Sequence, residues 1–137
     1  YSSDTKVLEA IAAGQGDVGV VNTYYYGRLM KKSPDLPLEI FWADQADKGV
    51  HVNVSGAGVV KYSKNKAQAV KFLEWLSDKE AQKIFADANM EYPVNQEVFP
   101  HSYVQGWGDF KESTLNLAKA GQLQAQAIKL MDMAGYK

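Results

Sequence analysis

The sequence contains no cysteine. Disulfides, thiolate zinc sites, iron–sulfur clusters and cysteine nucleophiles are therefore excluded together. Histidine is scarce as well, with only His51 and His101, and no Gly-x-Ser-x-Gly motif is present. Because no nucleophile stands with a base and an orienting residue, we do not expect an enzyme.

The chain also lacks long apolar runs and an excess of charge of one sign. No run approaches the roughly 20 apolar residues of a membrane-spanning helix. Fifteen basic and 16 acidic residues give a net charge of −1. This balance gives no electrostatic case for nucleic acid or an anionic membrane as a partner. With 46% hydrophobic residues among 137, the chain can still bury one core of ordinary domain size.

Three consecutive tyrosines, residues 24–26, are the most unusual feature that is present. They follow a valine-rich run of strand length, residues 18–21, and Thr23 is an acceptable N-cap for a helix that continues beyond them. The pattern predicts a strand that leads into a helix whose first turn carries the tyrosines. In α/β folds, ligands bind beyond the carboxyl ends of strands and beside helix N-termini, whose free N–H groups favour anions.

The tyrosine cluster has two interpretations. On composition alone, core packing or a stacking platform is the commoner role of such a cluster. Alternatively, two of the phenols converge on one ligand. Neighbours on a helix lie about 100° apart, so Tyr24 and Tyr25 can share one side of the helix while Tyr26 is turned farther round.

The rest of the chain predicts an α/β protein. Apolar residues at helical spacing predict a helix before residue 14, and prolines end the tyrosine helix near residue 34. Strands are then predicted at 38–42 and 50–54, and a glycine-containing strand at 55–60 is expected to cross from one part of the fold to another. A helix follows at 67–76. The next helix is predicted to begin at the capping box formed by Ser77 and Glu80. After a loop at 99–108, helices are predicted at 109–120 and at 123–134, separated by Gly121 and ending at Gly135.

Three segments resemble the C-terminal half of bacterial periplasmic ferric-iron-binding proteins, the substrate-binding subunits of iron(III) ABC importers. They read GDVGVVNTYY at 16–25, GVHVNVSGAGV at 49–59 and EYPVN at 91–95, in the family's order. The resemblance extends over nearly the whole chain, and the tyrosine pair after Asn-Thr is its most specific part. Since family members are considerably longer, it implies that an N-terminal half of the same polypeptide carries the remaining ligands.

This resemblance implies a periplasmic-binding-protein class II fold, of which the chain is the C-terminal portion of a two-lobe clamp. Residues 1–54 are then expected in the tyrosine-bearing lobe, residues 55–105 in the other lobe, and residues 106–137 back in the tyrosine-bearing lobe. The segment near residue 55 would act as the hinge between them.

The resemblance also implies the ligands. An adjacent tyrosine pair at this point binds Fe(III) in the family, which makes Tyr24 and Tyr25 the metal ligands and Tyr26 the weakest candidate of the three. Asn22 is expected to contact a synergistic anion such as carbonate, phosphate or citrate, or else to act as a turn former at the strand end.

The expected function is iron transport: a periplasmic solute-binding protein delivers Fe(III) to an inner-membrane ABC permease. The alternative keeps the fold and changes the ligand to a small organic molecule, a sugar, polyamine or phosphonate, held by stacking and hydrogen bonds from the tyrosines. A visible phenolate-to-iron band separates the two, because organic ligands add no colour.

Overall fold

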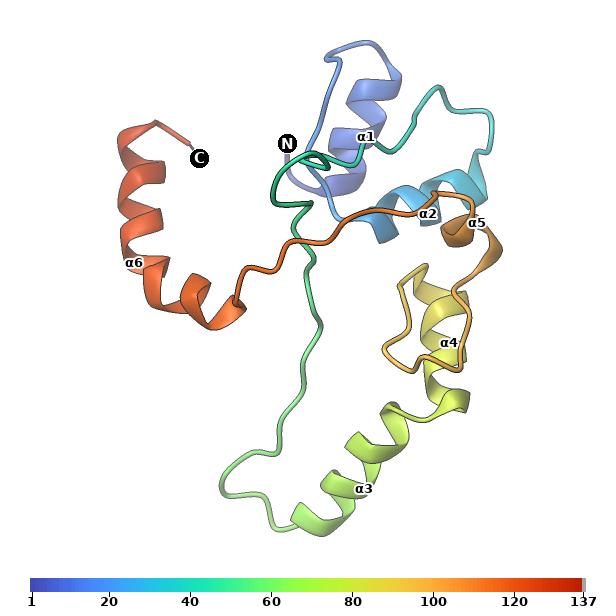
Figure 1. Cartoon of the computed structure of the whole chain (residues 1–137), viewed down its shortest axis with the longest axis vertical. Coiled ribbons are helices and arrows are strands. Elements are labelled where there is room, and N and C mark those ends of the chain that lie inside the picture. The colour runs from blue at the N-terminus through green and yellow to red at the C-terminus, as the bar shows by residue number, and fades with distance from the viewer. Residues whose placement is uncertain (137) are drawn as a thin grey trace. The chain divides into compact units, whose positions relative to one another are not determined.

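The computed structural model describes residues 1–136, which form helices joined by extended segments and loops (Figure 1). The chain divides into two compact units. Unit 1 comprises Tyr1–Phe41 and Ser55–Asp109, and unit 2 comprises Trp42–Val54 and Phe110–Lys137. No helix within residues 1–136 combines the length and the apolar character that crossing a membrane requires.

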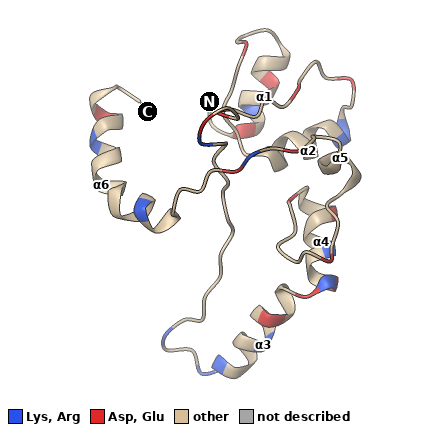
Figure 2. Cartoon of the chain, in the orientation of Figure 1, with Lys and Arg blue, Asp and Glu red and all other residues tan. Residues whose placement is uncertain are grey.

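Unit 1 contains five helices. Their bounds are α1 Asp4–Ala12, α2 Thr23–Lys32, α3 Lys66–Leu76, α4 Lys79–Asn89 and α5 Ser102–Gln105. The first four confirm the helices predicted from apolar spacing, whereas the short α5 lies inside a segment that was predicted as a loop. Figure 2 shows basic and acidic residues on each of α1, α3 and α4.

The predicted start of α4 was wrong by one residue. Asp78, not Ser77, is the N-cap of α4, and it makes no side-chain capping bond. Ser77 instead ends α3, and its hydroxyl donates to the carbonyl of Leu73 at 3.4 Å. The Ser77 side chain therefore bonds to α3, although the capping-box pattern had assigned it to α4.

The core of unit 1 is built where α2 meets the end of α4. Met90 is fully buried at the C-cap of α4, in the left-handed region with φ of 61°. Gly27 of α2 is buried against Met90 and Trp107, which brings α2 close to both. The buried apolar residues of the unit are Leu8, Ala10, Ala81, Ala86, Met90 and Val104. The division into lobes at residues 54 and 105 stays a prediction; within unit 1, α2 packs on residues that follow position 55.

The predicted strands are not formed within residues 1–136, and those predictions were wrong for this chain by itself. Residues 18–21, 38–42 and 55–60 belong to no strand ladder, and Val20 is 97% exposed. Of the strand predicted at 50–54, only Val50 pairs, in an isolated parallel bridge with Glu112. A strand is stable only when a neighbouring strand satisfies its backbone groups, so β-branched sequence alone does not form strands here.

Unit 2 is organised around that bridge. The N–H of Val50 donates to the carbonyl of Lys111 at 2.9 Å, and Ser113 N–H donates to the carbonyl of Val50 at 2.8 Å. The Gln45 side chain extends the pairing, since its amide donates to the Lys111 carbonyl at 3.1 Å and accepts from the Lys111 N–H at 2.6 Å. Trp42 stacks on Phe110 with ring centroids 4.3 Å apart.

The two helices predicted at 109–120 and 123–134 are one helix, α6, Leu117–Met133. Its N-cap Asn116 accepts from the N–H of Ala118 at 2.8 Å, and Gly121 lies inside the helix. A single glycine weakens a helix by about 1 kcal/mol but does not remove a backbone hydrogen bond, so the helix continues through it. The C-cap of α6 is Ala134, one residue before the predicted Gly135, which follows it in the left-handed region with φ of +67°.

Candidate functional site

The three tyrosines lie on the first turn of α2, as the sequence predicted. The helix begins after Asn22, which is extended with φ of −74° and ψ of 135°. The rings of Tyr24 and Tyr25 lie side by side, with centroids 4.5 Å apart and planes tilted by 37°. Both side chains are partly exposed. The expected sharing of one helix side by these two phenols is therefore confirmed.

The two phenols are also linked chemically. A hydrogen bond with Tyr25 is the main cause that raises the pKa of the Tyr24 phenol above its ordinary value. Desolvation and the nearby charges of Tyr25 and Asp4 act in the same direction, while Arg28 lowers the Tyr24 pKa. Two phenols whose rings lie side by side can both approach one cation, and a bound metal deprotonates its ligands.

Arg28 was not recognised as a site residue from the sequence. Its guanidinium carbon lies 4.8 Å from the centroid of the Tyr25 ring and 5.1 Å from that of Tyr24. Both distances are within cation–π range. The signal that marks it is its spacing, three and four residues after the tyrosines, which places it on their side of the helix.

Tyr26 points elsewhere. Its hydroxyl donates to the carbonyl of Leu38 at 3.1 Å, and its ring lies 5.8 Å from that of Trp107. Burial is the main cause that raises its pKa, and the charge of Glu39 adds to it. These contacts assign Tyr26 to the packing of unit 1.

Asn22 is engaged by a residue that sequence reasoning did not identify, Asp4 of α1. One carboxylate oxygen of Asp4 accepts from the backbone N–H of Asn22 at 2.9 Å and from its side-chain Nδ2 at 3.1 Å. The side chain of Asn22 consequently makes no capping bond to α2. No pattern in the sequence joins the two positions, since they meet only when α1 and α2 pack.

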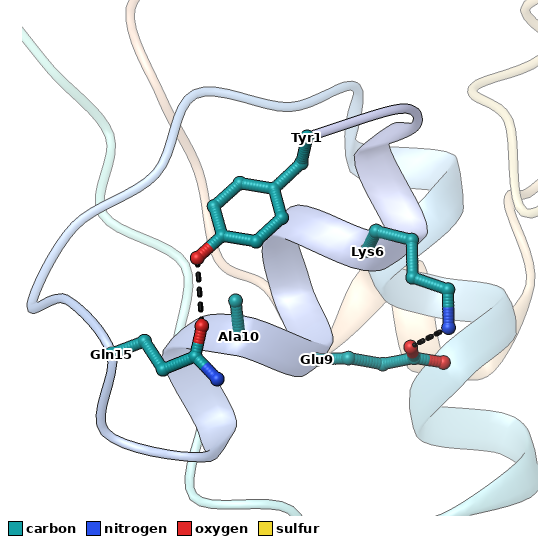
Figure 3. Close-up of a pocket in the computed structure, with 5 residues that line it drawn as sticks. All are labelled: Tyr1, Lys6, Glu9, Ala10 and Gln15. Atoms are coloured by element: carbon teal, nitrogen blue, oxygen red, sulfur yellow. Dashed lines mark hydrogen bonds and ion pairs between the residues drawn. The ribbon is translucent and has the colours of Figure 1, made fainter.

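Carboxylates and histidines do not form a metal site of their own in the part of the chain that the structure describes. No group of three or more acidic or histidine side chains is placed to hold an ion there. A shallow hollow on α1 is lined by Tyr1, Lys6, Glu9, Ala10 and Gln15 (Figure 3). Its polar groups bond to one another, Lys6 to Glu9 at 2.7 Å and Tyr1 to Gln15 at 2.8 Å. The phenol pair is thus the better candidate for a ligand site.

Comparison with known proteins matches residues 1–83 to the family of bacterial extracellular solute-binding proteins. The chain is 40% identical to iron uptake protein A1 of Synechocystis sp. over 141 aligned residues, which cover 98% of this chain and 39% of that protein. The chain therefore spans about two fifths of the length of this curated relative.

Solved structures show the same relation. The Trichodesmium protein IdiA (FutA), in complex with iron and citrate ligands, is 44% identical with a TM-score of 0.91, over all of this chain and 45% of the other. The ferric binding protein from Campylobacter jejuni is 33% identical with a TM-score of 0.93, again over 100% of this chain and 45% of the other. The predicted α/β architecture, a portion of the periplasmic-binding-protein class II fold, is confirmed by these matches.

Proposed function

Because this chain belongs to the family of bacterial extracellular solute-binding proteins, we propose that it carries the paired tyrosine ligands of a periplasmic protein that binds Fe(III) for an inner-membrane ABC permease. Tyr24 and Tyr25 are the proposed metal ligands. The observation that carries the proposal is the adjacency of the two phenol rings, with centroids 4.5 Å apart, on the first turn of α2.

The chemistry of the pair suits ferric iron. Fe(III) is small, hard and highly charged, so it favours anionic oxygen donors over neutral nitrogen or sulfur. A phenol with an ordinary pKa near 10 becomes such a donor when a cation replaces its proton. Two phenolates supply two negative charges on adjacent residues, and Arg28 above both rings offsets part of their mutual repulsion.

A bound anion fits the same place. Free N–H groups at the start of α2 favour negative charge, and Asn22 leaves them without a side-chain cap. We propose that Asn22 contacts this anion through the amide proton that is not directed to Asp4. The citrate named with the Trichodesmium relative supports a carboxylate anion, with carbonate and phosphate as further candidates.

Further ligands are proposed to come from an N-terminal half of the same polypeptide. Two phenolates fill only part of the coordination shell of Fe(III), and the relatives extend well beyond the part that this chain matches. Closure of a second lobe, formed in part by residues 55–105, would complete the site. We propose binding and delivery as the role, not catalysis, since the phenol pair stands without a nucleophile and base.

A ferric citrate titration followed by visible spectroscopy tests this function. We expect a phenolate-to-iron band that saturates at one ion per chain. The alternative, a small organic ligand held by the same tyrosines, predicts no band with iron and a change in tyrosine fluorescence with a sugar, polyamine or phosphonate. A chain that gives no band with iron at any citrate concentration would contradict the proposal.

Citrate competition tests the incompleteness of the site. We expect this chain to lose iron at citrate concentrations at which a protein of the relatives' full length retains it, because two-point attachment leaves positions open to chelators. Equal retention would mean that a further oxygen donor lies within residues 1–137, with Tyr26 the first to replace by phenylalanine.

A further inference from the structure

The start of the tyrosine helix is held by a carboxylate from α1. Asp4 lies in the first turn of α1, and one of its oxygens receives both the backbone N–H and the side-chain amide of Asn22, at 2.9 and 3.1 Å. Both bonds are partly buried. A charged acceptor makes them stronger than bonds between neutral groups. Asp4 thus fixes the backbone and the side chain of Asn22 at once.

The segment that leads into α2 has little else to fix it. Val18 and Val20 are 81% and 97% exposed, so this part of the loop packs on almost nothing. Gly19 touches Val7 and Ile11 of α1, which guides the loop but does not orient the first helical turn. How Asn22 is held therefore contributes to the direction in which α2 begins, together with the packing of Gly27 farther along the helix.

We infer that Asp4 is a positioning residue for the tyrosine pair: by holding Asn22 through two hydrogen bonds, it orients the first turn of α2 so that the phenols of Tyr24 and Tyr25 stay adjacent. The inference rests on the proposed function and names a further residue of the same site. Asp4 acts through Asn22 and is not itself a ligand. Groups that orient a metal's ligands commonly change metal affinity by about ten- to a hundredfold when they are removed.

Two substitutions separate the hydrogen bonds of Asp4 from its charge. Asp4→Asn keeps an oxygen that can accept from both donors of Asn22, whereas Asp4→Ala removes the acceptor. Asp35→Ala is the matched control, because it removes an exposed carboxylate that follows the far end of α2 from Asn22. Circular dichroism of each variant checks that the helices are retained.

The first measurement needs no iron. Amide hydrogen exchange of Asn22, whose N–H donates to Asp4, should be slow in the parent chain and in Asp4→Asn, and clearly faster in Asp4→Ala. Unchanged exchange in Asp4→Ala would overturn the inference, since Asp4 would then not hold Asn22 in solution.

The second measurement is a ferric citrate titration of the same variants. Asp4→Ala should weaken the apparent affinity by about tenfold and shift the phenolate-to-iron band, while Asp4→Asn and Asp35→Ala stay close to the parent. Asn22→Ala combined with Asp4→Ala should lose less than the sum of the two single losses, because the two residues share one linkage. Equal affinity for iron in Asp4→Ala and in the parent chain would overturn the positioning role alone. A parent chain that gives no band with iron would overturn the proposed function and, with it, any role of Asp4 in ferric-iron binding.

Discussion

Gly27 of α2 lies directly against Met90, the residue that ends α4. A Cβ atom placed on Gly27 would come within 2.8 Å of the Met90 Cβ and within 3.0 Å of the Trp107 ring. Gly27 is buried and Met90 is fully buried, so neither neighbour has room to withdraw. This close approach joins the tyrosine helix to the rest of unit 1.

Gly27→Ala should therefore destabilise the chain. Alanine favours a helix by up to about 1 kcal/mol over glycine, but overpacking a full core costs typically about 1–3 kcal/mol. We expect the overpacking to dominate, with a net loss of about 1–2 kcal/mol in the free energy of unfolding measured with urea. Gly121→Ala is the control, because Gly121 is also helical and nothing lies within 4 Å of its would-be Cβ. That variant should be slightly more stable than the parent, and a stable Gly27→Ala variant would contradict the packing.

Helices were easier to predict from this sequence than strands, for a physical reason. A helix satisfies its backbone within its own segment, so the spacing of Val7, Leu8 and Ile11 was enough to predict α1. A strand needs a partner, and the valines of residues 18–21 carry no information on whether one is near. Gly121 misled in the other direction, because a glycine in an exposed helix lowers stability without ending the helix.

Phenylalanine substitutions separate the tyrosines by role. Tyr24→Phe and Tyr25→Phe should each abolish the visible ferric band, because each removes one of two phenolates. Neither change should alter the helix content, since both side chains are partly exposed. Visible spectra taken during ferric citrate addition provide the measurement, best made in a protein of the relatives' full length. If both single variants kept the band, the assignment of the pair would be abandoned.

Tyr26→Phe should do the reverse and keep the band. The hydroxyl of Tyr26 bonds to the Leu38 carbonyl, so its loss should lower the free energy of unfolding by about 1 kcal/mol. A vanished band with unchanged stability would place Tyr26 in the metal site instead.

The candidate site was only partly visible in the sequence. The pairing of Tyr24 with Tyr25 follows from adjacency on a helix turn, and the separate direction of Tyr26 follows from the same geometry. Arg28 was readable from its spacing after the tyrosines but was not recognised as a site residue. Asp4 could not be found this way, because its contact with Asn22 depends on how two helices pack, which no local pattern encodes.

Alkaline pH should weaken the fold through Tyr92. Burial is the main cause that raises the pKa of the Tyr92 phenol, and the charge of Asp109 raises it further. Above pH of about 10 the unfolded chain releases this proton while the folded chain still holds it, so the contribution of Tyr92 to stability is complete below that pH and is lost as the pH rises through the folded pKa.

Urea unfolding at a series of pH values from about 9 upward measures this loss. Tyr92→Phe should make the decline less steep, since the substituted side chain has no proton to release. Tyr62→Phe serves as the matched control, because it removes a hydroxyl from a side chain that is 82% exposed. An equally steep decline in Tyr92→Phe and the parent would contradict the linkage.

The apolar face of α3 should make the chain associate. This face carries Val70, Leu73 and Leu76 at helical spacing, and Val70 is 45% exposed. Phe72 and Trp75 extend it, with exposed fractions of 56% and 38% and rings stacked 5.8 Å apart. Contiguous apolar surface of this kind usually marks a surface that another chain or domain covers.

Sedimentation equilibrium measures the association directly. The weight-average mass should rise above 15.2 kDa as the protein concentration increases. Phe72→Glu should reduce that rise, whereas Gln68→Glu, which adds the same charge to an exposed polar position of α3, should change it much less. A strictly monomeric chain with a single cooperative unfolding transition would show that α3 needs no covering partner. The assignment of residues 55–105 to a separate lobe would then fall, because a lobe that lacks its other half must leave apolar surface to be buried.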